Sequence, residues 1–184
     1  AIELTAITDP QARVNALIAG DMHMISDVDA KMIKLIERSN GVSINSTKSG
    51  RYGGICILKN TAPGNNPDFV KGMQLIQDRE RIVRSILKGH GEVGNDHPIS
   101  TAYGADHCYE LPQRQFDPDK AKYHLKKSGI TSAELFLAEV ATGIGDSCLL
   151  MQNNLKKIGF DLKIKKVPTD GYWGAVWMKE PLNV

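Results

Sequence analysis

The stretch DPDKAKYHLKKSG, residues 117–129, carries the signals for both the beginning and the end of a helix. Asp117 is a residue type that caps a helix with its carboxylate, and Pro118 presets φ at the first helical position. Gly129 tolerates the left-handed backbone that ends many helices. The stretch therefore predicts a helix that begins at Pro118 and stops at Gly129, and the rest of the chain can be read outward from it.

A second marked run follows, LLMQNNLKKIGFDLKIKKVPTDGYW at residues 149–173. Apolar residues spaced by three and four positions form one stripe of a helix, and Gly159 ends it. Beyond this glycine, residues 160–165 alternate between apolar and polar, which is typical of a half-buried strand. The stripe consists of Ile144, Cys148, Met151, Leu155 and Ile158. The run predicts a helix that leads into a sheet.

Strand-like and helix-like segments alternate along the remainder of the chain. Strands are expected at residues 2–7, 22–26, 42–46 and 53–58 and in a short segment after Gly129. Helices are expected at 10–19 with Asp9 as cap, near 29–38, and at 67–87 with Gly89 as stop. Residues 90–115 show little periodicity, and long irregular segments of this kind are often functional. The alternation predicts an α/β or α+β fold in which helices pack on a mixed sheet.

Composition sets wider bounds. The chain has 184 residues, 41% hydrophobic and 24% charged, with a net charge of +2, and it is expected to form a single domain. It has no basic block with interleaved aromatic residues, so no nucleic-acid partner is expected. It has no apolar run long enough for a membrane span and no signal peptide. Because residues 2–7 look like an interior strand, we expect residues 1–184 to be a piece of a longer protein.

The three cysteines form neither a disulfide framework nor a zinc motif. One disulfide and one free thiol remain an open alternative in an oxidising compartment. Cys56 lies between two isoleucines and Cys148 lies on an apolar helical stripe, so both are interpreted as small buried hydrophobes. Cys108 carries no such signal.

Several stretches together resemble one family. RVNALIAGDMHMISDVD (residues 13–29), PDFVKGMQLIQDRERIVRSILKGHG (67–91) and NDHPI (95–99) match its loose patterns in order, as does the run of capped helix, strand, helix and strand after Asp117. The chain resembles the periplasmic solute-binding proteins of peptide-type (oligopeptide, dipeptide or nickel) ABC importers, the bacterial extracellular solute-binding protein family 5. Lys71 departs from the family pattern, which usually has arginine there.

The resemblance implies that residues 1–184 form most of one lobe of a two-lobed, type II periplasmic binding protein. Two lobes of such a protein close over a peptide or another small polar solute and present it to permease subunits in the membrane. The location implied is the periplasm, or the outer face of the membrane for a lipoprotein. No cofactor and no metal are implied, and the family's main specificity residues are expected to follow Val184.

Candidate ligand-binding residues come from the irregular segments. The loop at 95–97 offers short polar groups, although its sequence also suits a turn. Backbone N–H groups at the start of the helix after Gly143 favour an anion, although Thr142 can simply cap that helix. Aromatic rings near 172 can stack on a ligand, although such pairs are more often packed in the core. The candidates are Asn95, Asp96, His97, Tyr103, Thr142, Gly143, Tyr172 and Trp173.

Two other classes of function were weighed against a transport role. A small hydrolase would draw on neighbours such as Asp96-His97, Asp106-His107-Cys108 or Asp146-Ser147-Cys148, but adjacent residues rarely face one another. The chain lacks GxSxG, HExxH and GxxxxGK[ST], and the GxGxxG spacing of GHGEVG at residues 89–94 follows a predicted helix rather than a strand, so no catalytic residue is assigned and an enzyme is not expected. A solute-sensing domain of a transcriptional regulator is the alternative, and a helix-turn-helix outside these residues would distinguish it.

Overall fold

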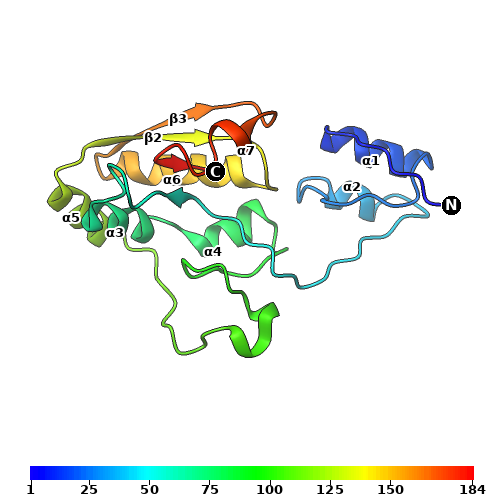
Figure 1. The fold of residues 1–184 in the computed structure, drawn as a ribbon. Helices are drawn as coiled ribbons and strands as arrows, with labels where there is room; N and C mark the ends of the chain where they lie inside the picture. Colours follow the sequence, from blue (N-terminus) through cyan, green and yellow to red (C-terminus); the bar gives the residue numbers. More distant parts are fainter. The chain divides into compact units, whose positions relative to one another are not determined.

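The computed structural model describes residues 1–184, which divide into two compact units, residues 1–47 and residues 48–184. Figure 1 shows helices in both units and the sheet in the second. No helix is long and apolar enough to cross a membrane.

The first unit is built from two short helices. In α1 (Pro10–Ala19), the Asp9 carboxylate accepts a hydrogen bond of 2.7 Å from the N–H of Ala12, which confirms the predicted cap. Gly20 ends this helix at φ 85°, in the left-handed conformation that glycine adopts without strain. The second helix, α2 (Ile33–Glu37), is shorter than the predicted 29–38. The buried apolar side chains of this unit are Val14, Ala30, Ile33 and Ile36.

The strands predicted at 2–7 and 22–26 are absent, and that part of the prediction is wrong. Neither segment has a partner strand, and Ile2 and Leu4 are each 92% exposed. The N–H of Met22 instead bonds to the carbonyl of Ala16 and closes the end of α1. Alternating apolar residues make a strand only where a neighbouring strand supplies hydrogen bonds.

The second unit holds a four-stranded mixed sheet in the order β1-β4-β2-β3, which confirms the predicted fold class. The strands β2 (Ser132–Leu137) and β3 (Asp161–Lys166) are parallel along their whole length, from Ser132 opposite Asp161 onward. The helix α6 (Ile144–Lys157) connects these two strands (Figure 1). The short strand β4 (Leu182–Asn183) runs parallel to β2 and antiparallel to β1 (Cys56–Ile57).

The two faces of the sheet carry different helices. Leu135 and Leu137 belong to the main core together with the α6 residues Cys148, Met151 and Leu155. The alternate side chains, Phe136 and Ala138, form a smaller cluster with Tyr172 of the one-turn helix α7 (Tyr172–Ala175) and with Val176. Because successive residues of a strand point to opposite faces, α6 covers one face and α7 the other.

Two capped helices pack beside this sheet. The helix α5 (Pro118–Ser128) has the predicted bounds, with Asp117 accepting a 2.9 Å bond from the N–H of Lys120 and Gly129 at φ 73°. It packs against α3 (Pro67–Leu75). A Cβ atom at Gly72 of α3 would lie only 2.6 Å from Cγ of Leu125 on α5, so a larger residue there would clash. Gly72 therefore permits a close approach of the two helices.

The single helix predicted at 67–87 is divided into three parts. After α3 the chain turns at Gln77 and starts again at α4 (Arg79–Arg81), where Asp78 caps the N–H of Arg81 at 3.1 Å. It continues into η1 (Ile82–Ile86), a turn of π-helix, with the N–H of Leu87 bonded to the carbonyl of Ile82. The apolar periodicity continues across the break, so periodicity alone did not reveal it.

Other departures are smaller. Of the segments predicted as strands at 42–46 and 53–58, only β1 pairs with another strand. The irregular segment 90–115 contains one short 3-10 helix, η2 (Thr101–Asp106). All three cysteines are free thiols: Cys148 is buried as predicted, Cys56 is half-buried and Cys108 is exposed.

Candidate functional site

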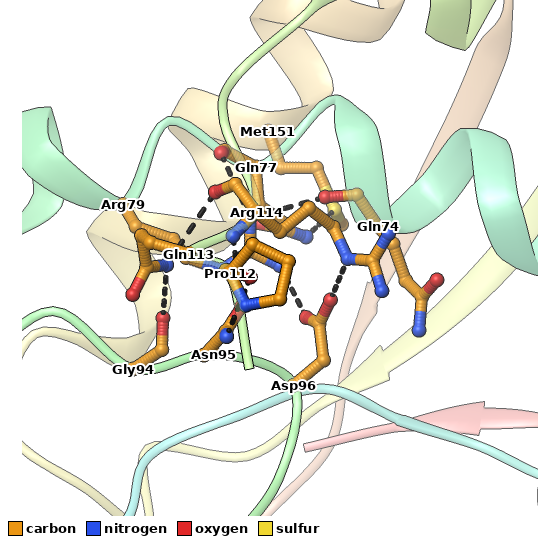
Figure 2. A network of polar contacts seen from close by, with 10 residues as sticks. All are labelled: Gln74, Gln77, Arg79, Gly94, Asn95, Asp96, Pro112, Gln113, Arg114 and Met151. Atoms are coloured by element: carbon orange, nitrogen blue, oxygen red, sulfur yellow. Dashed lines mark hydrogen bonds and ion pairs between the residues drawn. The ribbon is translucent and has the colours of Figure 1, made fainter. Parts of the chain in front are cut away.

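An ion-pair hub joins the α3–α4 junction to two parts of the irregular segment (Figure 2). The carboxylate of Asp96 binds Arg79 through one oxygen and Arg114 through the other. The three side chains are 20%, 11% and 26% exposed, respectively, so the hub is partly shielded from water. Asp96 also has φ 57°, a backbone conformation that aspartate and asparagine adopt more readily than most residues.

Arg79 stabilises the break between α3 and α4. Its guanidinium donates to the carbonyl of Gln74 at 3.1 Å and to that of Gln77 at 3.3 Å. The last carbonyls of a helix have no partner within the helix, and a cationic side chain is a suitable donor for them. Arg79 therefore closes the end of α3 while its other nitrogen binds Asp96.

Neighbouring amide side chains fix the same loop. The side-chain oxygen of Asn95 accepts from the N–H of Arg114 at 2.9 Å, and its nitrogen donates to the carbonyl of Pro112 at 3.0 Å. Gln113 donates to the carbonyl of Gly94 at 2.9 Å. Side-chain hydrogen bonds thus hold residues 94–96 beside residues 112–114, as backbone hydrogen bonds do between the strands of a sheet.

A tyrosine packs next to this hub. The ring of Tyr52 lies against the backbone of Gly54, where a Cβ would come within 2.7 Å of its Cε1 atom, and a Cβ at Gly94 would come within 3.3 Å of Cε2. Burial and the nearby Asp96 carboxylate raise the pKa of the Tyr52 phenol. Gly54 and Gly94 therefore make room for the Tyr52 ring.

Two depressions adjoin the hub and share Gln113 and Arg114. The larger, of about 370 Å³, has two cationic residues and no carboxylate in its wall, and we call it the basic depression. Its wall consists of Lys71, Asn95, Leu111, Pro112, Gln113 and Arg114. The smaller, of about 230 Å³, carries both signs of charge, because Asp78 and Glu80 line it with the arginines.

The start of α6 has a carboxylate beside it. Gly143 occupies the cap position at φ 73° and no side chain caps the helix, so the alternative reading of Thr142 as its cap is wrong. The carboxylate of Glu139 already lies against Gly145 in the first turn, where a Cβ would overlap it. Burial and then this carboxylate raise the pKa of Cys148 to about 12. The proposed role of Thr142 and Gly143 in binding an anion stays a prediction.

The two aromatic candidates have different environments. Tyr172 is 1% exposed and its hydroxyl lies 3.3 Å from the side-chain oxygen of Asn183, so it is a core residue. Trp173 is 62% exposed, and its ring meets that of Trp177 edge-on with centroids 5.5 Å apart. Of the pair, only Trp173 offers a ring to a ligand, and its stacking role stays a prediction.

The remaining candidates lie in the exposed part of the irregular segment. The ring of His97 lies 5.5 Å from that of His107, whose Nδ1 is 2.7 Å from the carbonyl of Ile99. Tyr103, in η2, is 49% exposed. No group of three or more histidine, cysteine or acidic side chains is placed to hold a metal ion.

The structure thus brings Asn95 and Asp96 together with residues that the sequence reading did not single out as site residues, namely Tyr52, Lys71, Arg79 and Arg114. Of these four, Arg79 and Lys71 lie in the stretch 67–91 that matches a family pattern, Arg79 in agreement with it and Lys71 as a departure from it. The candidates Thr142, Gly143, Tyr172 and Trp173 lie elsewhere, near the ends of α6 and α7.

Comparison with known proteins identifies the family. The model for bacterial extracellular solute-binding proteins, family 5 Middle, matches residues 1–183. The oligopeptide-binding protein AppA of Bacillus subtilis strain 168 is 27% identical over 187 residues, covering 92% of this chain and 33% of AppA. The chain therefore spans about a third of the length of this relative.

Solved structures share the fold. NikZ from Campylobacter jejuni, in complex with Ni(L-His), superposes with a TM-score of 0.80 at 18% identity, over 96% of this chain and 37% of NikZ. DppA from Helicobacter pylori, in complex with the peptide STSA, gives 0.77 at 19% identity, over 90% and 32%. AppA from B. subtilis, in complex with a nonapeptide, gives 0.74 at 24% identity, over 91% and 36%. With the family match over residues 1–183, these likenesses confirm the resemblance in the sequence: the chain belongs to the bacterial extracellular solute-binding proteins, family 5.

Proposed function

We propose that this chain is part of the substrate-binding component of an ABC importer, which captures a peptide or a related small polar solute between two lobes and delivers it to the membrane permease. The family match over residues 1–183 carries the proposal. The relatives named above are binding proteins rather than enzymes, and two of them were solved with peptides. The proposed location is the periplasm or the outer face of the membrane.

Features of the second unit support a solute-binding role. Trp173 presents an exposed ring, and the basic depression presents polar and cationic groups on a loop that side chains hold in place. Solute sites combine apolar or aromatic walls with a few fixed polar groups. Because the chain spans a third of AppA, these groups would form only part of a cleft, and the second lobe would supply the remaining contacts.

A thermal-shift screen tests this function. The protein that carries these residues would be heated with di- and oligopeptides, with Ni(II)–histidine and with maltose as an unrelated solute. We expect a peptide mixture to raise the melting temperature by several degrees, because a ligand at 100 times its Kd stabilises the folded state by about 2.7 kcal/mol. Isothermal titration would then give the affinity for the best peptide.

The outcomes separate the solute classes. Stabilisation by Ni(II)–histidine and not by peptides would keep the transport role and exclude the peptide. Stabilisation by none of these solutes, with the protein folded, would contradict the proposal. Delivery to a permease needs its own test: cells lacking the protein should lose uptake of the solute that binds, and restoring the gene should recover it.

A further inference from the structure

The strand β3 is the last strand of the sheet, so one of its two edges has no strand beside it (Figure 1). The N–H groups of Asp161 and Val167, at the start and just past the end of β3, donate to carbonyls on the β2 side. Because successive peptide groups of a strand point in opposite directions, those of Leu162, Ile164 and Lys166 point away from β2. Unpaired groups of this kind are a template for a further strand. We call the outward backbone groups of these three residues the free edge of β3.

The helix α6 lines this edge without closing it. Gln152 of α6 donates to the carbonyl of Leu162 at 2.7 Å, so one acceptor of the free edge is already bound. The outward groups of Ile164 and Lys166 lie farther along the strand. Leu149, on the same side of α6 three residues before Gln152, is 43% exposed. It adds apolar surface beside the free edge, on the face of the sheet that α6 covers.

The side chains of β3 differ between the two faces of the sheet. Leu162 and Ile164 pack with the main core on the α6 face. Lys163 and Lys165 therefore point to the opposite face, where the Lys165 ammonium lies 4.6 Å from the centre of the Phe136 ring. Together the six residues of β3 carry three lysines and one carboxylate, which gives a net charge of 3 − 1 = +2. The free edge thus has an apolar side and a cationic side.

Neighbouring elements carry both signs of charge. Lysines 156 and 157 end α6, and the nearby carboxylates are Glu134, opposite Lys163 in the register, and Glu139 and Asp146 toward the start of α6. An added strand meets the side chains of β3 first, because directly opposite residues lie about 5 Å apart. Like charges in such pairs are destabilising. The lysines of β3 therefore disfavour a second copy of this edge and favour an acidic strand.

We propose that the free edge of β3 is a docking site for an extended segment of a partner protein, in which acidic and apolar residues alternate, and which adds a strand to the sheet. Its acidic side chains lie on the face of Lys163 and Lys165, and its apolar side chains lie on the α6 face beside Leu149. In this mode of recognition main-chain hydrogen bonds supply affinity and alternate side chains supply specificity. The site is independent of any solute cleft.

The test uses two capped hexapeptides of opposite charge, Glu-Val-Glu-Val-Glu-Val and Lys-Val-Lys-Val-Lys-Val. Each would be added to the protein that carries residues 1–184, with backbone hydrogen exchange followed by mass spectrometry in fragments covering residues 161–167. We expect the acidic peptide to slow the exchange of the outward N–H groups and the basic peptide to leave it unchanged. Fragments from α5 should not respond, which separates docking from a general stabilisation by peptide held in a solute cleft.

Variants separate the backbone from the charge. Lys166→Pro removes one outward N–H at a position where an edge strand tolerates proline, and it should weaken the acidic peptide about ten-fold in fluorescence anisotropy, whereas Lys166→Ala should cost less than three-fold. Lys163→Glu should weaken it about five-fold, and Lys122→Glu, at an exposed position of α5, should change nothing.

Two results would overturn the inference: equal protection of residues 161–167 by both peptides or by neither, and equal affinities of Lys163→Glu and Lys122→Glu. Neither result touches the thermal-shift test of the transport role. Conversely, protection of this edge by the acidic peptide would stand even if no solute stabilised the protein.

Discussion

Replacing Asp96 with asparagine removes the negative charge between Arg79 and Arg114 and changes little else. Asparagine has nearly the same shape as aspartate and accepts the φ of 57° found at this position. One of its two groups still accepts a hydrogen bond, but its NH₂ then faces the other guanidinium. The Asp96→Asn variant therefore isolates the contribution of the charge to the ion-pair hub.

The expected loss of stability follows from the burial of the three side chains. Breaking a fully buried ion pair costs about 3–5 kcal/mol, and an exposed pair contributes about 1 kcal/mol or less. With Arg79 at 11% exposure and Asp96 at 20%, the hub lies between these limits, so we expect a loss of about 2 kcal/mol. At a urea m-value of about 2 kcal/mol/M, the unfolding midpoint should fall by about 1 M.

Urea unfolding followed by tryptophan fluorescence is a suitable assay. Both tryptophans, Trp173 and Trp177, lie in residues 48–184, so the signal reports on the unit that contains the hub. Asp96→Ala should lose about 1 kcal/mol more than Asp96→Asn, because alanine is strained at a positive φ. Asp161→Asn, on an exposed strand position, is the control. An Asn variant within about 0.5 kcal/mol of the native protein would refute the reasoning, since surface changes alone have that effect.

Three further outcomes are expected. Gly72→Ala should destabilise the second unit by about 1–3 kcal/mol in the same urea assay through overpacking at Leu125, whereas Gly174→Ala, which meets no atom within 4 Å, should not. At pH 8, iodoacetamide should label the exposed Cys108 within minutes and leave Cys148 unmodified, because burial raises the pKa of the latter to about 12; mass spectrometry of peptides would show it. Hydrogen bonds from His124 and Lys127 lower the pKa of Asp68 below its ordinary 3.8. The contribution of Asp68 to stability is therefore present above pH 3.8 and is lost as the pH falls through the lowered pKa. In a plot of unfolding free energy against pH, Asp68→Asn should remove this acid-side loss.

Local signals predicted well the two helices that have a capping residue at each end. The helix at α5 was placed to within a residue because capping residues mark both of its ends, and the same holds for α1. The strands at 2–7 and 22–26 were predicted from alternation alone, and they are absent because no neighbouring strand pairs with them. Alternation in the sequence indicates which side chains of a segment can face a core. A strand also needs a second segment to pair with, and local patterns do not identify that segment.

The site was harder to predict for the same reason. Asn95 and Asp96 were chosen as short polar residues on a loop, and the structure shows that their side chains bind Arg79, Arg114 and Pro112. These partners lie 17 to 19 residues away in the sequence, so nothing near the loop indicated them. Polar loop residues thus hold the wall of a depression through their bonds to distant side chains and carbonyls.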